Sequence, residues 1–207
     1  MPAPARTIIL ATRSAGKLRE LRPLFAEHGF STIDLNEAGI AETPDEDELD
    51  CFATFEDNAL AKARHFFRRA GVPTVADDSG LAVDALGGSP GVHSKRWSGR
   101  ADLTGQDLDD ENNALLLRAL EGKGNRSARY VCAAAYVFGE RELVRRGEVA
   151  GAIARSPRGT GGFGYDPFFA ADELGGRTFA EVSRDEKARI SHRARAMRAL
   201  IGELERG

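Results

Sequence analysis

The chain has 207 residues, of which 42% are hydrophobic and 29% are charged, an ordinary composition for a folded globular protein. Its formal net charge of -3 gives no overall basic character, so nucleic acid is not expected to be the main partner. The two cysteines, Cys51 and Cys132, are far apart, which argues against a zinc site or a disulfide scaffold and fits the cytoplasm. No apolar run approaches the roughly 18 residues of a membrane span, and Met1–Arg6 is too short for a signal peptide.

The first element predicted is a buried strand over residues 7–12, followed by a helix that Ser14 caps and Gly29 ends. This β–turn–α order is typical of a parallel-sheet protein. The turn between them contains Thr12, Arg13, Ser14, Ala15, Gly16 and Lys17. Hydroxyls, a glycine and two cations beside a helix N-terminus favour an anion site, with phosphate the usual ligand. The alternative is a solvated basic turn.

Residues 36–50 are acidic and lack periodicity, so they are predicted to form a loop. Thr54 then begins a helix with one apolar face. Asp57 lies three residues after Thr54, a spacing that favours a capping role, although its carboxylate could equally point at a metal.

The apolar run 72–76 predicts a buried strand that leads directly into Asp77-Asp78-Ser79-Gly80. A turn at Ser79-Gly80 would hold both carboxylates at the C-terminal edge of that strand, where open α/β sheets bind ligands. Adjacent like charges are costly to bury unless a cation lies between them. The alternative is an ordinary polar turn.

Residues 87–91 are too rich in glycine and proline for regular structure. The basic residues Lys95 and Arg96 follow, and a mobile loop carrying them could close on a polyphosphate. An exposed basic loop is the alternative. A helix after Thr104 comes next, on which Asn112 and Asn113 are unremarkable.

Two β-rich runs, 128–138 and 143–154, predict a hairpin and therefore a mixed sheet. The glycines of the following segment, 156–169, formally spell GxGxxG, but Pro167 argues against a dinucleotide-binding helix and hence against a Rossmann oxidoreductase. Instead, Phe163 and Tyr165 offer a flat face to a base and Asp166 offers an acceptor. A glycine loop with packing aromatics is the alternative.

The last helical segment begins at a capping box, Ser183 to Glu186. Lys187, His192 and Arg193 cannot share one face of a straight helix, because only residues three or four apart do so. If they act together, the helix must break near Ile190, with Ser191 starting a new helix. The alternative is a basic exposed helix.

Five segments carry a resemblance to a known family: ATRSAGKLREL, TFEDNALAKA, ADDSGLAVDALGGSPGVHSKRWSG, GTGGFGYDPFF and EKARISHRARAM. In this order they resemble the Ham1/RdgB-like inosine triphosphate pyrophosphatases, also called dITP/XTP pyrophosphatases. The resemblance covers nearly the whole chain, and five motifs in register are far more specific than any one of them.

This resemblance implies one two-lobed domain over residues 1–207, with an elongated mixed β-sheet flanked by helices and a central active-site cleft. It also implies Mg2+-dependent hydrolysis of non-canonical purine nucleoside triphosphates (ITP, dITP and XTP) to the monophosphate and pyrophosphate. That activity keeps deaminated purines out of nucleic acid. The implied partners are the purine nucleoside triphosphate and a second copy of the chain, with neither nucleic acid nor membrane.

Position by position, the resemblance makes Asp78 the general base and a magnesium ligand, with Asp77 and Asp57 as further metal positions. Asp57 stands where the family usually has glutamate, Ser14 where it commonly has asparagine, and His93 where tyrosine is more usual. The implied substrate-binding positions are Thr12, Arg13, Ser14, Ala15, Gly16, Lys17, Ser79, Lys95, Arg96 and Lys187 on the phosphate side, Phe163, Gly164, Tyr165 and Asp166 on the base and sugar side, and His192 and Arg193 at the 6-keto group.

The mechanistic hypothesis is that Asp78 activates a water for in-line attack on the α-phosphorus, while Mg2+ and the basic groups neutralise charge. Two rival functions remain open. One is a nucleotide-binding sensor without turnover. The other is a nucleotide pyrophosphatase of different base preference, such as a Maf-like enzyme.

Overall fold

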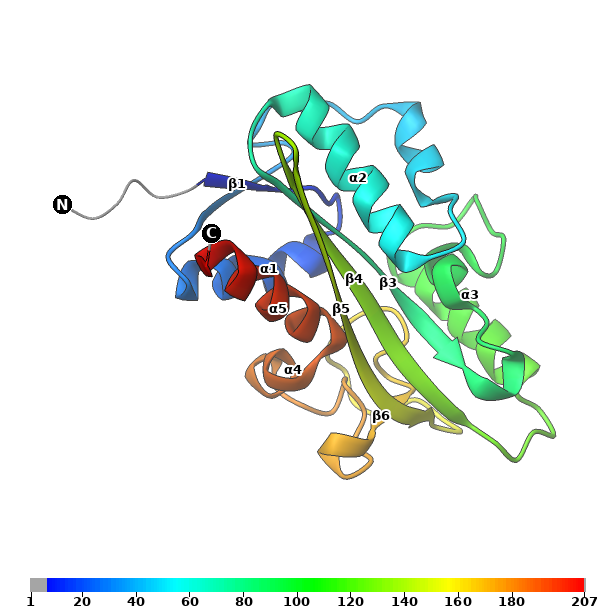
Figure 1. Ribbon diagram of the computed structural model, residues 1–207. Coiled ribbons are helices and arrows are strands. Elements are labelled where there is room, and N and C mark those ends of the chain that lie inside the picture. The colour runs from blue at the N-terminus through cyan, green and yellow to red at the C-terminus, as the bar shows by residue number, and fades with distance from the viewer. Residues whose placement is uncertain (1–6, 207) are drawn as a thin grey trace. The chain divides into compact units, whose positions relative to one another are not determined.

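The computed structural model describes residues 7–206, except for the side chain of Asp47 (Figure 1). Met1–Arg6, where no signal peptide is predicted, lie outside the described residues. The helices are α1 (Ala15–Glu27), α2 (Phe55–Ala70), α3 (Gly105–Ala119), α4 (Arg184–Ile190) and α5 (His192–Arg206), and the 3-10 helices are η1 (Pro44–Asp50), η2 (Asp84–Leu86), η3 (Gly91–Arg96) and η4 (Asp172–Leu174). Within residues 7–206, no helix combines the length and the apolar character needed to cross a bilayer.

The strands form one six-stranded sheet with the order β2-β1-β3-β4-β5-β6. They are β1 (Thr7–Leu10), β2 (Ser31–Asp34), β3 (Thr74–Val83), β4 (Ser127–Phe138), β5 (Arg141–Ile153) and β6 (Phe169–Ala171). Strand β1 pairs in parallel with both β2 and β3, whereas β5 pairs antiparallel with β6. The predicted mixed α/β sheet flanked by helices is therefore confirmed.

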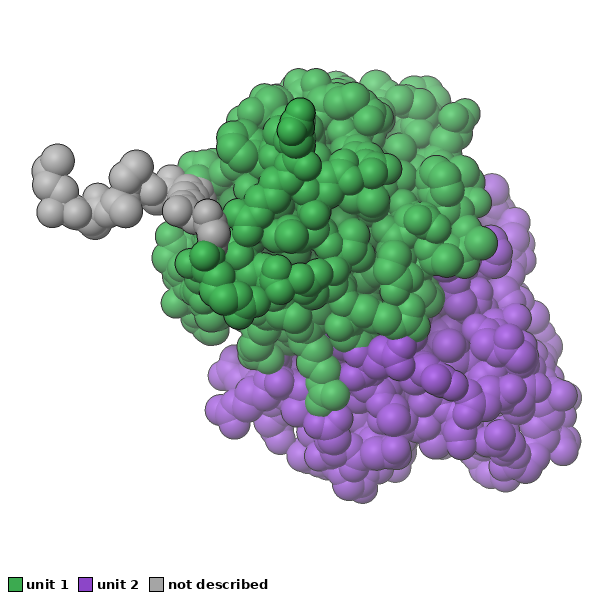
Figure 2. Space-filling model, in the orientation of Figure 1, with its two compact units in different colours: residues 1–78, 132–147, 193–207 green, residues 79–131, 148–192 purple. Residues whose placement is uncertain are grey.

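Two compact units divide the chain (Figure 2). Unit 1 comprises Met1–Asp78, Cys132–Gly147 and Arg193–Gly207, and unit 2 comprises Ser79–Val131 and Glu148–His192. The predicted central cleft concerns the relation between these units, and it stays a prediction.

Unit 1 has a core in which α1 and α5 pack against the strands (Figure 1). Helix α1 supplies Leu21, Leu24 and Phe25, and α5 supplies Met197 and Leu200, all at helical spacing and all buried. Ser14 starts α1 as predicted, because its side chain accepts the Lys17 N–H at 3.3 Å. The helix N-terminus of the predicted phosphate turn is therefore a real structural feature.

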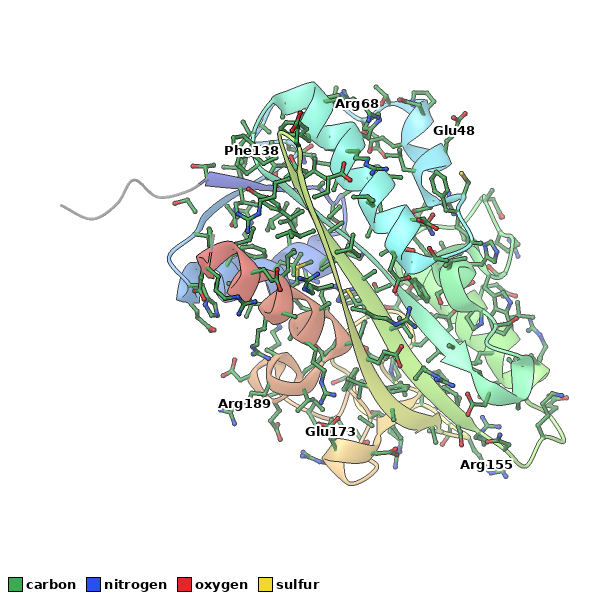
Figure 3. All side chains as sticks on the ribbon, in the orientation of Figure 1. Glu48, Arg68, Phe138, Arg155, Glu173 and Arg189 are labelled. Atoms are coloured by element: carbon green, nitrogen blue, oxygen red, sulfur yellow. The ribbon has the colours of Figure 1, made fainter. Side chains whose placement is uncertain are left out.

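Unit 2 has a separate core formed by β3, α3, β4, β5, β6 and the segments on either side of β6. Its largest buried members include Leu81, Leu116, Ile153, Phe169 and Phe179. Phe138, which is labelled in Figure 3, lies at the end of β4. Its exposed fraction is 46%.

The predicted break after Ile190 is confirmed: α4 ends there, Ser191 has an extended ψ of 148°, and α5 begins at His192. The predicted turn at Ser79-Gly80 is wrong, because β3 continues through both residues to Val83. Leu81 and Val83 face the unit 2 core on alternating positions, and this burial keeps the chain extended against the local turn preference of Ser-Gly. The predicted loop 36–50 contains the 3-10 helix η1, and η3 begins at Gly91, the last residue of the predicted irregular segment 87–91.

Candidate active site

The acidic pair lies inside β3, not at its end, and this position determines what each carboxylate can contact. Successive side chains of a strand point to opposite faces of the sheet. Asp77 contacts residues of α1 and α5, while Asp78 contacts residues of α2. The two carboxylates therefore serve different helices, instead of sitting side by side at one edge.

Asp77 is the centre of a buried ion-pair network in unit 1. Its Oδ2 lies 2.9 Å from the Lys17 Nζ and 3.2 Å from the Arg193 Nε, and its side chain is 0% exposed. The guanidinium of Arg193 also pairs with Glu20. Lys17 and Arg193 lie 60 and 116 residues away in sequence, so the fold brings two distant basic groups to Asp77.

The charge state of this network follows from its neighbours. Burial acts to raise the pKa of Asp77, but the positive charges of Lys17, Arg193 and Lys62 outweigh burial and hold that pKa well below its ordinary value. Burial acts to lower the pKa of Arg193, and Asp77 and Glu20 outweigh it, so that pKa is raised. Both groups therefore remain charged, although they are buried.

Asp78 is held from the opposite face by α2. Asn58 Nδ2 donates to its Oδ2 at 3.0 Å, and Lys62 Nζ lies 2.9 Å from its Oδ1. The same Lys62 Nζ lies 2.7 Å from Asp50 Oδ1, at the end of η1. Burial acts to lower the pKa of Lys62, but Asp78, Asp50 and Asp77 outweigh it and raise that pKa. One ammonium thus fixes two carboxylates.

Asp57 has the capping role that its spacing predicts. Its N–H donates to Thr54 Oγ1 at 3.1 Å, and the Thr54 hydroxyl donates to its carboxylate at 2.6 Å. The residue is exposed. Within residues 7–206, no three His, Cys, Asp or Glu side chains form a group that could hold a metal, so Asp57, Asp77 and Asp78 are not clustered.

In the predicted phosphate turn, the two cations have different partners. Lys17 points to Asp77, whereas Arg13 makes two bonds to the Glu46 carboxylate at 2.7 and 3.1 Å. Arg13 also donates to Asn36 Oδ1 at 3.2 Å and to the Ile40 carbonyl at 3.0 Å. Arg13 therefore fastens η1 and the preceding chain to this turn.

Unit 2 contains the predicted base-side residues in a buried cluster. Asp166 Oδ2 lies 2.6 Å from Lys187 Nζ and accepts the Phe163 N–H at 2.9 Å. The Lys187 ammonium lies 4.9 Å from the centre of the Phe163 ring, within cation–π range. Lys187 and Asp166, which the sequence assigns to the phosphate side and the base side, are thus direct partners.

Two other predicted residues, Tyr165 and His192, are buried by contacts within unit 2. Tyr165 is 5% exposed, and its hydroxyl donates to the Ser94 carbonyl at 2.8 Å. His192 is 4% exposed and its ring stacks on Tyr130, with centroids 4.5 Å apart and an interplanar angle of 9°. By contrast, Lys95 and Arg96 on η3 are exposed, and Ser79 and Phe163 are half-buried.

Sequence reasoning missed Glu20, Asp50, Asn58 and Lys62 as members of the candidate site. Asn58 and Lys62 are four residues apart on α2 and therefore share a face, so helical spacing could have paired them. Asp50 lies in an acidic segment without periodicity, where nothing in the sequence distinguishes it from its neighbours.

The fold and these side chains define an α/β protein whose central strand gathers carboxylates and distant cations beside a helix N-terminus, an arrangement suited to an anionic, phosphorylated ligand. The chain belongs to the Ham1 family, whose model matches residues 8–203. It is 44% identical over 202 residues to a dITP/XTP pyrophosphatase of Ralstonia nicotianae, covering 96% of each chain. It is 46% identical over 200 residues to a dITP/XTP pyrophosphatase of Mycolicibacterium paratuberculosis, covering 96% of this chain and 95% of that protein.

Solved structures agree with this assignment. A HAM1 protein from Coxiella burnetii aligns with a TM-score of 0.83 at 36% identity, covering 97% of this chain and 99% of that one. A nucleoside-triphosphatase described as a dITP/XTP pyrophosphatase, from Mycobacterium abscessus, aligns with a TM-score of 0.71 at 44% identity, covering 94% and 98%.

Replacing Asp77 with asparagine is expected to destabilise the protein by roughly 3–5 kcal/mol, because it leaves Lys17 and Arg193 buried beside a neutral group. Urea unfolding followed by circular dichroism measures this loss. Asp102→Asn is the control, since Asp102 forms its ion pair with Arg100 at an exposed position, and little change is expected there. An Asp77→Asn protein as stable as the wild type would contradict the account of this network.

Proposed function

We propose that this protein hydrolyses non-canonical purine nucleoside triphosphates, ITP, dITP and XTP, to the monophosphate and pyrophosphate. The observation that carries the proposal is the set of fixed carboxylates on β3, with Lys62 on Asp78 and Lys17 on Asp77. The names of the relatives, dITP/XTP pyrophosphatases at about 45% identity over nearly the whole chain, support the same reaction. The cellular role is then removal of deaminated purines from the nucleotide pool.

The triphosphate is assigned to the turn from Thr12 to Lys17 and to Ser79, Lys95, Arg96 and Lys187. The N-terminus of α1 supports this assignment, since helix N-termini attract phosphate through their N–H groups and dipole. Within the turn, Lys17 is the cation near the carboxylates, and Arg13 acts mainly through Glu46 by fastening η1. Ala15 and Gly16 contribute backbone amides.

Asp78 is the proposed general base. Its carboxylate is fixed by Asn58 on one oxygen and Lys62 on the other, so its orientation toward an attacking water is set before substrate arrives. Each of these oxygens has a further lone pair, which leaves acceptor capacity for that water. Attack on the α-phosphorus then releases pyrophosphate as the leaving group.

Mg2+ fits the chemistry of this donor set, because it prefers carboxylate oxygens and keeps several waters. Asp78 and Asp50 approach the same ammonium, and Asp77 Oδ1 is buried with no hydrogen-bond partner among the described residues. Because these aspartates do not form a ready-made metal group, Asp78 would be the main protein ligand, with Asp77 and Asp57 as the further predicted positions, and waters and phosphate oxygens would supply the other ligands. Asp50, which shares Lys62 with Asp78, is better placed than the exposed Asp57 to assist. When bound, Mg2+ supplies charge neutralisation on the phosphates.

The purine is assigned to Phe163, Gly164, Tyr165 and Asp166, with His192 and Arg193 at the 6-oxo group. An N–H donor pairs with the 6-oxo group of hypoxanthine or xanthine and is left unpaired against the 6-amino group of adenine. Tyr165 is buried and its hydroxyl bonds the Ser94 carbonyl, which supports a structural role for its ring. Phe163 is then the ring proposed to stack on the base. We also propose that the protein acts as a homodimer in the cytoplasm.

The direct test of this function is a pyrophosphate-release assay with ITP, XTP, dITP, GTP and ATP, each with and without Mg2+. Rapid Mg2+-dependent release from the first three and slow release from ATP are expected. Binding without release would favour a sensor, and a preference for canonical nucleotides would contradict the proposed specificity.

Replacing Asp78 with asparagine should reduce kcat by about 100-fold or more with a modest change in KM, because the amide cannot accept a proton. Steady-state kinetics with ITP and Mg2+ measure both constants. Asp102→Asn is the matched control, since Asp102 lies at an exposed position beside Arg100 and has no part in the proposed site, so its kcat should stay close to that of the wild type. A kcat for Asp78→Asn near the wild-type value would remove Asp78 from the chemistry.

Replacing His192 with phenylalanine keeps a ring against Tyr130 but removes both ring nitrogens. The ratio of kcat/KM for ITP to that for ATP should fall by about tenfold or more, because the loss removes a donor to the 6-oxo group. His28→Gln is the control, since His28 contacts Glu205 at the surface. An unchanged ratio in a folded His192→Phe protein would exclude His192 from base reading.

A further inference from the structure

Helix α3 presents three polar side chains to the main chain of other segments. Asp109, Asn112 and Asn113 are three and four residues apart, so they share one face of the helix. The two asparagines are only 2% and 5% exposed. The expectation that these asparagines are unremarkable is therefore wrong, since Asn112 bonds a residue 17 positions away and Asn113 bonds one 51 positions away.

Asp109 and Asn113 hold both sides of a single residue, Gly164. Asp109 Oδ2 accepts the Gly164 N–H at 2.7 Å, and Asn113 Nδ2 donates to the Gly164 carbonyl at 3.0 Å. Gly164 has a φ of +63°, a backbone conformation that favours glycine. It lies between Phe163 and Tyr165, so fixing its donor and acceptor fixes the path of the chain that carries the proposed stacking ring.

Asn112 does the same for the basic segment at the end of η3. Its Nδ2 donates to the Lys95 carbonyl at 3.0 Å, and its Oδ1 accepts the Ser98 N–H at 2.8 Å. Lys95 and Arg96, the exposed cations proposed for the phosphates, lie within the segment so held. One face of α3 thus bonds two segments: the one around Gly164, proposed to bind the base, and the one from Lys95 to Ser98, proposed to bind the phosphates.

Burying these polar side chains costs free energy that exposure to water would avoid. Burial raises the pKa of the Asp109 carboxyl, against the opposing effect of the Gly164 N–H, and the negative charges of Asp110 and Asp166 raise it further, while the Lys95 cation opposes them. Asn113 Oδ1 is buried and has no hydrogen-bond partner among the described residues. A carboxylate and an amide that are kept at this cost on the N–H and the carbonyl of one residue favour a role in placing that residue.

We propose that Asp109, Asn112 and Asn113 are positioning residues for the substrate: Asp109 and Asn113 place the base loop through Gly164, and Asn112 places the basic segment through Lys95 and Ser98. This inference rests on the proposed function. It assigns two separable effects to neighbouring residues of one helix. Loss of the Gly164 contacts changes base selection, whereas loss of the Asn112 contacts weakens every nucleoside triphosphate alike.

The experiment measures kcat and KM for ITP and ATP in Asp109→Ala, Asp109→Asn and Asn112→Ala proteins, with thermal unfolding to verify folding. Asp109→Ala should raise the KM for ITP about tenfold, change kcat by less than about twofold, and reduce the ITP-to-ATP ratio of kcat/KM. Asp109→Asn should restore the wild-type KM, because its amide oxygen can accept the same N–H. Asn112→Ala should raise KM for both nucleotides and leave their ratio unchanged.

Asp110→Asn is the matched control, because Asp110 is the next residue of α3 and is exposed. Its carboxylate accepts a hydrogen bond from the Gln106 side-chain amide at 2.8 Å, on the same helix. Its constants should equal those of the wild type. Absence of turnover in the wild type would overturn the proposed function itself. Turnover by the wild type together with an unchanged KM in a folded Asp109→Ala protein, or equal selectivity changes in the Asp109→Ala and Asn112→Ala proteins, would overturn the positioning role alone.

Discussion

The burial of one carboxylate, that of Asp77, is the constraint on which the arrangement of unit 1 depends. A side chain with no exposed surface can stay ionised only if cations reach it, and the fold supplies Lys17 from α1 and Arg193 from α5. Because these helices also share one hydrophobic core, the ion pairs and the apolar packing select the same arrangement. The N-terminus of α1, the proposed phosphate site, is thereby fixed to the central strand.

Strand alternation then separates two tasks between neighbouring residues. Asp77 faces α1 and α5 and is fully enclosed, which suits a role in holding cations in place. Asp78 faces α2, keeps 11% of its side chain exposed, and shares Lys62 with Asp50, which suits a group that must meet water and substrate. A turn holding both carboxylates at one edge would have given them the same surroundings. Because the strand is extended, Asp77 and Asp78 have different neighbours and different exposure, although they are adjacent in sequence.

Local signals in the sequence predicted the features that depend on local physics. Ser14 as a helix cap, Thr54 with Asp57 at the start of α2, and the break between Ile190 and His192 all follow from short-range spacing. The mixed sheet followed from the hairpin combined with the first β–turn–α unit. The family resemblance identified the family to which the chain belongs, and its assignments to Asp77 and Asp78 stay predictions.

The features that the sequence did not predict depend on partners far along the chain. The turn expected at Ser79-Gly80 gives way to burial of Leu81 and Val83 in the unit 2 core. The Arg13 guanidinium donates to the carboxylate of Glu46, 33 residues away, and the Asn113 amide donates to the Gly164 carbonyl, 51 residues away. Such bonds involve main-chain groups or interchangeable carboxylates, which leave no pattern in the sequence to mark them.

The central claim is that Asp77 and Lys17 form a buried, energetically coupled pair that holds the proposed phosphate turn to β3. A double-mutant cycle on the free energy of unfolding, with Asp77→Asn, Lys17→Met and the double variant, tests it most directly. A coupling energy above about 1 kcal/mol is predicted, because the two groups are in contact and one is fully buried. Additive effects of the two substitutions would contradict the claim.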